Sequence, residues 1–130
     1  MKVEIRNLVG GTATVCGPDL TVGEAADVMV EERIGSLGVI EAGSLVGIFT
    51  DRDVLRAVAA GADCTSALVE EWMTADPDHL TPDVRVSDAA EWLMATGYRH
   101  LPVVENGQLL GIVSIKDVLW AVNERESGGD

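Results

Sequence analysis

The sequence predicts an α+β fold of two β-α-β-β-α repeats that pack on each other through their sheets with pseudo-twofold symmetry. Residues 72–125 align with residues 8–61 at a constant offset of 64 and without a gap. Of the 54 aligned positions, 17 are identical. Each copy shows the same order of helix-like and strand-like apolar patterns. A unit of this size cannot bury its apolar face alone, so two copies should share a core.

The periodicity places the elements of each copy. Apolar residues recur at i, i+3, i+4, i+7 and i+8 from Val22 and again from Val86, which predicts the first helix. Two strand-like runs follow, at 37–40 and 45–49 in one copy and at 101–104 and 109–113 in the other. The turn at Asn106-Gly107 favours a tight hairpin, because both central positions of a type I′ turn need positive φ. Second helices should begin after Thr50 and Ser114, and short extended pieces near 12–15 and 79–81 complete the units.

These patterns divide the chain into four parts. The first repeat spans 8–61 and the second spans 72–125. Residues 62–71 connect them, and the apolar positions around Leu68 to Met73 predict a short helix there. Residues 126–130, which contain Gly128 and Gly129, should be a frayed tail.

Composition narrows the class of protein. The 130 residues include 22 acidic and 9 basic side chains, a net charge of −13. This charge repels nucleic acid phosphates and anionic membranes, so neither is an expected partner. The sequence has no long apolar run and no apolar stretch typical of a signal peptide near its start, and we expect a soluble, cytoplasmic protein.

The cysteines and histidines suggest neither a metal site nor a catalytic centre. Cys16 and Cys64 fit no metal-ligand spacing and are expected to be reduced thiols. The two histidines and the carboxylates do not form a set of nucleophile, base and orienting group. We therefore expect no metal, no cofactor and no enzymatic activity.

One segment occurs in both copies and could carry binding chemistry. Residues 47–53 (GIFTDRD) recur as residues 111–117 (GIVSIKD), with a glycine three positions before a hydroxyl residue and an aspartate three after it. A local explanation exists, because a hydroxyl residue followed three positions later by an acid is close to a helix capping box.

The same geometry also suits a nucleotide. The start of a helix offers free N–H groups to a phosphate, and an aspartate can accept both hydroxyls of a ribose. Arg52 and Lys116, each one residue before the aspartate, could contact phosphate, and Gly47 and Gly111 would allow a base or sugar close to the backbone.

With these residues in view, the chain resembles a tandem pair of CBS domains, often called a Bateman module, over about residues 8–125. The resemblance rests on the two G-x-x-[ST]-x-x-D segments, on residues 98–104 (YRHLPVV) and on residues 72–74 (WMT). The resemblance implies two clefts between the repeats that bind an adenosine ligand such as AMP, ADP or ATP, with S-adenosylmethionine or a dinucleotide also possible. It also implies a sensor that acts on a partner or a fused domain.

The resemblance assigns the ligand-binding residues. Thr50 with Asp53, and Ser114 with Asp117, would hold the ribose and phosphate region, with Arg52 and Lys116 beside them. Arg99 and His100 would reach the phosphates in the Thr50/Asp53 cleft. The first copy has Gly35 and Ser36 in their place, so the two clefts should be unequal and the Thr50/Asp53 cleft better suited to phosphate.

Three classes of function stay open at this point. A nucleotide-sensing regulatory module that signals to an unidentified protein in trans is favoured, a structural or partner-binding dimer is the alternative, and an enzyme comes third. We also expect a homodimer formed through helix faces, since the predicted helices carry large apolar residues, namely Met29, Met94, Trp92 and Trp120.

Overall fold

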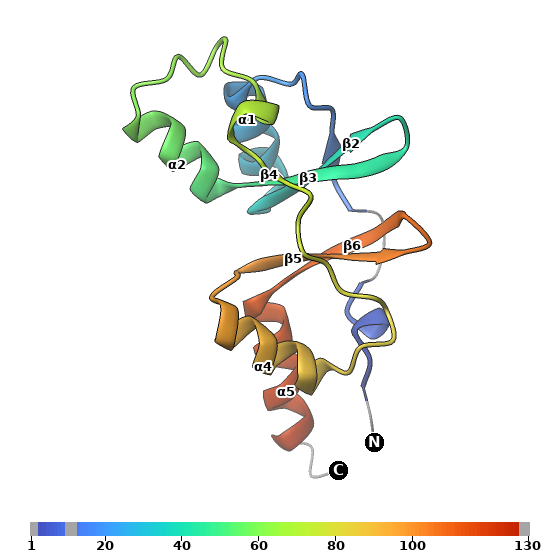
Figure 1. Ribbon diagram of the computed structural model, residues 1–130. Helices are drawn as coiled ribbons and strands as arrows, with labels where there is room; N and C mark the ends of the chain where they lie inside the picture. The colour runs from blue at the N-terminus through green and yellow to red at the C-terminus, as the bar shows by residue number, and fades with distance from the viewer. Residues whose placement is uncertain (1–2, 10–12, 128–130) are drawn as a thin grey trace. The chain divides into compact units, whose positions relative to one another are not determined.

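The computed structural model describes residues 3–9 and 13–127, which form two compact units (Figure 1). The first-repeat unit comprises residues 13–77. The second-repeat unit combines residues 3–9 with residues 78–127. Each unit thus contains one copy of the repeat and one further segment. In the first-repeat unit this segment follows the copy in the sequence, and in the second-repeat unit it is residues 3–9, far from the copy in the sequence.

The first-repeat unit is a four-stranded sheet with helices packed against it. Its strands lie in the order β1 (Val15–Cys16), β2 (Ser36–Glu41), β3 (Ser44–Thr50) and β4 (Thr74–Ala75). β1 pairs with β2 in parallel, and the other pairs are antiparallel. The helices of this unit are α1 (Val22–Glu32), α2 (Asp51–Ala59) and the short α3 (Val69–Trp72).

The second-repeat unit repeats this plan. The strands β5 (His100–Glu105) and β6 (Gln108–Ser114) form an antiparallel hairpin, and Leu80 makes a parallel bridge to Val103. The helices α4 (Val86–Thr96) and α5 (Ile115–Ser127) pack against each other beside the hairpin (Figure 1). A single turn of 3-10 helix, η1 (Ile5–Asn7), comes from the start of the chain.

The predicted elements are confirmed. Helices begin at Val22 and Val86, and both hairpins form with the same irregularity in register, after Val39 in one and after Val103 in the other. Asn106 and Gly107 have φ values of 52° and 78°, as a type I′ turn requires. The short helix near residue 70 is α3.

Helix α5 extends to Ser127, since residues 124–126 (ERE) are good helix formers and the first glycine comes at position 128. The frayed tail over residues 126–130 stays a prediction. Residues 128–130, and Thr12 of the first predicted strand, lie outside the described residues.

The segments that come before the two repeats are also related by the offset of 64 residues, although their sequences do not show it. Ile5 N–H donates to the Val84 carbonyl at 2.8 Å, as Val69 N–H donates to the Leu20 carbonyl at 2.8 Å. Arg6 and Glu70 make the equivalent pair of bonds, to the carbonyls of Pro82 and Pro18. Residues 3–9 therefore complete the second-repeat unit as residues 67–73 complete the first-repeat unit.

Each unit has its own apolar core, and the two cores use equivalent positions. Ile5 and Val69 are both fully buried, Ile5 among the second-repeat helices and strands and Val69 in the first-repeat core. Other members matched by the offset are Val86 with Val22, Leu93 with Met29, Leu101 with Leu37, and Val113 with Phe49. Met29 is thus a core residue and not part of an exposed helix face, contrary to the expectation.

Candidate functional site

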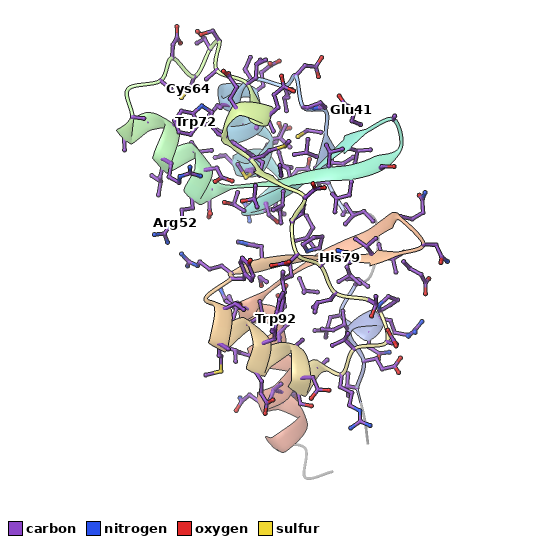
Figure 2. All side chains as sticks on the ribbon, in the orientation of Figure 1. Glu41, Arg52, Cys64, Trp72, His79 and Trp92 are labelled. Atoms are coloured by element: carbon purple, nitrogen blue, oxygen red, sulfur yellow. The ribbon has the colours of Figure 1, made fainter. Side chains whose placement is uncertain are left out.

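The first motif, residues 47–53, lies where β3 passes directly into α2. Thr50 is the N-cap of α2, in an extended conformation with φ −124° and ψ 169°, and Asp53 is the third helical residue. The side chain of Arg52, from the same turn, is exposed and projects from the start of the helix (Figure 2). The motif therefore brings Thr50, Arg52 and Asp53 together at one helix start.

Both carboxylate oxygens of Asp53 already have donors. Oδ2 accepts the Thr50 N–H at 2.9 Å and the Thr50 hydroxyl at 3.3 Å. Oδ1 accepts Nη1 of Arg56 at 2.9 Å. Asp53 is 6 % exposed, and among the described residues it is the one buried charged side chain. A buried carboxylate needs such partners, because burial without them is costly.

Arg56 is itself held in place. Its guanidinium carbon lies 5.8 Å from the centre of the Trp72 ring, within the range of a cation–π contact. Trp72 comes from α3, which packs against α2. Arg56 and Trp72 are not among the site residues predicted from the sequence. The signal that could have found Arg56 is its i,i+3 spacing from Asp53, which suits an ion pair on a helix.

The second motif, residues 111–117, lies where β6 passes directly into α5, as the first motif lies between β3 and α2, but its environment is different. The Ser114 N–H donates to Asp117 Oδ2 at 3.3 Å, and the Asp117 N–H donates to the Ser114 hydroxyl at 3.0 Å. This reciprocal pair is a complete capping box, so the local explanation of the motif is confirmed here. Asp117 and Lys116 are exposed, and Trp120 occupies the position equivalent to Arg56.

Arg99 and His100 lie at the same end of the hairpin as the second motif. The Arg99 carbonyl accepts the N–H of Ile115 at 2.8 Å, and His100 pairs with Ser114 across β5 and β6. The Arg99 side chain is exposed and that of His100 is partly buried. The predicted approach of these two residues to Thr50 and Asp53 stays a prediction.

The two motif glycines have a packing role that the sequence analysis did not foresee. A Cβ at Gly111 would lie 2.7 Å from Cγ1 of Val9, and one at Gly47 would meet Met73 and the Thr74 carbonyl, the latter at 3.0 Å. Val9 and Met73 belong to the two equivalent segments that complete the units. The glycines thus make room for those segments, whether or not a ligand also approaches them.

His79 lies elsewhere, in a hollow of about 340 Å³ near the turn between β5 and β6. The hollow is also lined by Arg6, Asp83 and Glu105. Two of its charged side chains have local partners, since Arg6 donates to Glu4 at 2.7 Å and the Thr81 hydroxyl donates to Asp83 at 2.6 Å. The Thr81 bond and the Asp83 backbone lower the pKa of the Asp83 carboxyl.

Two further observations concern metals and membranes. Within residues 3–9 and 13–127, no group of three or more His, Cys, Asp or Glu side chains is placed to hold a metal ion. No helix in that part of the chain is long and apolar enough to span a membrane.

Cys16 is half-buried, and this burial, with a smaller effect of Asp19, raises the pKa of its thiol to about 11.

Comparison with known proteins agrees with this architecture. A family model described as the CBS domain matches the chain twice, at residues 5–60 and 69–124. The "Uncharacterized 17.7 kDa protein in bps2 3′region" of Acidianus ambivalens is 40% identical over 124 residues, which cover 94% of this chain and 74% of the relative.

Solved structures show the same fold. The CBS-domain containing protein ATU1752 from Agrobacterium tumefaciens is 35% identical, with a TM-score of 0.85 over 92% of this chain and 99% of its own. CBSX2 of Arabidopsis thaliana, solved in complex with AMP, is 27% identical, with a TM-score of 0.81 over 93% of this chain and 97% of its own.

Two tandem matches that together span most of the chain define its family. The chain belongs to the CBS domain family and is a tandem CBS pair, consistent with a Bateman module. The α+β fold of two β-α-β-β-α repeats is that of CBS-pair structures.

Proposed function

We propose that this CBS pair is a regulatory module that binds an adenosine nucleotide of the AMP, ADP or ATP class at its two motifs. The observation that carries the proposal is that both copies keep the hydroxyl and the aspartate at the start of a helix that follows directly on a strand. There the free helix N–H groups suit phosphate and the carboxylates suit ribose. The AMP complex of the related CBSX2 supports this ligand class.

The proposed contacts follow the sequence prediction. Thr50 and Asp53 would bind one ligand and Ser114 and Asp117 another, with Arg52 and Lys116 beside the phosphates. Arg99 and His100 are proposed as phosphate contacts for the Thr50/Asp53 site. We expect Arg99→Ala to weaken binding of AMP much more than binding of adenosine, because a charge-assisted hydrogen bond to phosphate is lost.

A thermal-shift panel of AMP, ADP, ATP, S-adenosylmethionine and a non-adenine control such as CMP tests the ligand class. A ligand at 100 times its dissociation constant adds about 2.7 kcal/mol to the free energy of unfolding. For a domain of this size that is a rise of several degrees. A matched Asp53→Ala/Asp117→Ala variant should lose the shift. A flat response to the whole panel would favour a structural or partner-binding role instead.

The proposal includes a homodimer that signals to a regulated protein in trans. Both helix pairs expose apolar side chains at equivalent positions, Val30 with Met94 and Leu55 with Leu119. Trp120 is also exposed, whereas Trp92 is half-buried against the core and beside Tyr98, so it does not belong to this surface.

Light scattering at micromolar concentration should give a dimer, and Leu55→Glu/Leu119→Glu should give a monomer. A wild-type monomer in both low and high salt would contradict this part of the proposal.

A further inference from the structure

We infer that Arg56 is a specificity-determining residue that makes the two motifs recognise ribose differently: Asp117 can accept both hydroxyls of a ribose, and Asp53 only one. The inference rests on the proposed function, since it concerns how the same two aspartates contact a nucleotide. It is carried by the contacts of the aspartates themselves.

Counting acceptor positions shows the difference. An ionised carboxylate offers about four lone-pair positions. At Asp53, two donors from Thr50 occupy Oδ2, and Arg56 occupies one position on Oδ1. Counted over the described residues, one acceptor position on Oδ1 remains. A ribose presents two neighbouring hydroxyls, so Asp53 can accept a hydrogen bond from one of them, and the other gains none from it.

Asp117 has more of its acceptor capacity left. Among the described residues, one donor, the Ser114 N–H, reaches its Oδ2, at the longer distance of 3.3 Å. Arg56 has no cationic equivalent here, because position 120 is a tryptophan that is 65 % exposed. Both oxygens of Asp117 can therefore accept a ribose hydroxyl.

Arg56 should stay in place when a ligand binds. Its release would leave a buried carboxylate without a charged partner, which is costly. Its contact with the Trp72 ring adds a second attachment. The residue equivalent to Trp72 in the second-repeat unit is Leu8, which offers no aromatic face to a cation.

The consequence is a difference in tolerance of deoxyribose. At the first motif, one of the two hydroxyls contributes nothing through Asp53, so one of 2′-deoxy-AMP and 3′-deoxy-AMP should bind about as well as AMP. At the second motif both hydroxyls are used, and each deoxy analogue should bind about tenfold more weakly, since a hydrogen bond to a charged group is lost each time.

Calorimetry with AMP and the two deoxy analogues tests this on the full chain. Asp117→Ala isolates the first motif and Asp53→Ala isolates the second. In the Asp117→Ala background, Arg56→Met keeps an aliphatic side chain next to Trp72 but frees Oδ1. Both analogues should then bind about tenfold more weakly than AMP. Arg56→Lys keeps a donor for Asp53, and it should restore the tolerance of one analogue.

The readout separates this role from a purely structural one. If Arg56 only stabilises the fold, Arg56→Met changes the affinity for AMP and both analogues by the same factor, and the inference is wrong. It is also wrong if both analogues bind weakly while Arg56 is present, or if Asp117→Ala abolishes AMP binding. In those three cases AMP binding by the wild type still supports the proposed function. A wild type that binds none of the three ligands overturns the inference, and it overturns the proposed function as well if ADP and ATP also give no binding.

Discussion

Asp53 and Asp117 occupy equivalent positions in two copies of one motif, yet their surroundings differ. Asp53 is buried and paired with Arg56, whereas Asp117 is exposed and the position equivalent to Arg56 is a tryptophan, Trp120. Each lies at the start of a helix that follows directly on a strand, and each accepts the N–H of the hydroxyl residue three positions before it. The comparison teaches that the backbone motif sets where a ligand could bind, while a side chain one helical turn away sets how much of the aspartate is available to it.

The largest expected effect concerns the segments that complete the two units. Ile5→Ala should lower the free energy of unfolding by about 3 kcal/mol, because it leaves a cavity in the second-repeat core, where Ile5 is fully buried. Val69→Ala at the equivalent position removes fewer atoms and should cost less. Urea denaturation measures both, and Arg6→Ala at an exposed site is the control.

A loss below about 1 kcal/mol for Ile5→Ala would mean that residues 3–9 are not an integral part of the second-repeat unit. That result would contradict the equivalence between residues 3–9 and residues 67–73.

The next effect separates the two motifs directly. Arg56→Met should lower the free energy of unfolding by about 1–2 kcal/mol, because Asp53 would lose its charged partner. The value is below that of a fully buried pair, since the Arg56 side chain is 59% exposed and its charge is partly screened. Trp120→Met at the equivalent position should change stability by less than about 0.5 kcal/mol. Equal losses in thermal or urea unfolding would remove the claimed difference between the motifs.

The smallest effect concerns the two hairpin turns. Ala42 and Asn106 both have a φ of 52°, which alanine adopts at a cost and asparagine tolerates better. Ala42→Gly should raise the free energy of unfolding by about 0.5–1 kcal/mol, and Asn106→Ala should lower it by a similar amount. Opposite shifts in melting temperature support this comparison, and shifts of the same sign would break it.

Much of the fold could be predicted because its signals are local and occur twice. The helix stripes from Val22 and Val86 and the Asn106-Gly107 turn each predict an element, and the second copy checks the first. The role of residues 3–9 could not be predicted in this way. Ile5 and Val69 are similar but not identical, and Arg6 and Glu70 have opposite charges, so the repeat is not visible there in the sequence.

The candidate site was predicted in part. The capping of each helix by Thr50 or Ser114 with the following aspartate was visible as a spacing. The different availability of the two aspartates was not, because it depends on burial and on the position of Trp72, which comes from a different helix. From the sequence, the Thr50/Asp53 site is expected to bind phosphate better than the Ser114/Asp117 site. From the contacts of the two aspartates, we infer that Asp117 can accept more ribose hydroxyls than Asp53. The two expectations concern different parts of a nucleotide.

The most direct test of two unequal nucleotide sites is a titration of the isotope-labelled chain with AMP, followed by the backbone amide NMR signals of residues 50–53 and 114–117. We predict that both groups of signals shift, each along its own curve and with a different midpoint. Shifts that follow one common curve in both motifs, or that occur instead around Arg6 and His79, would contradict the account.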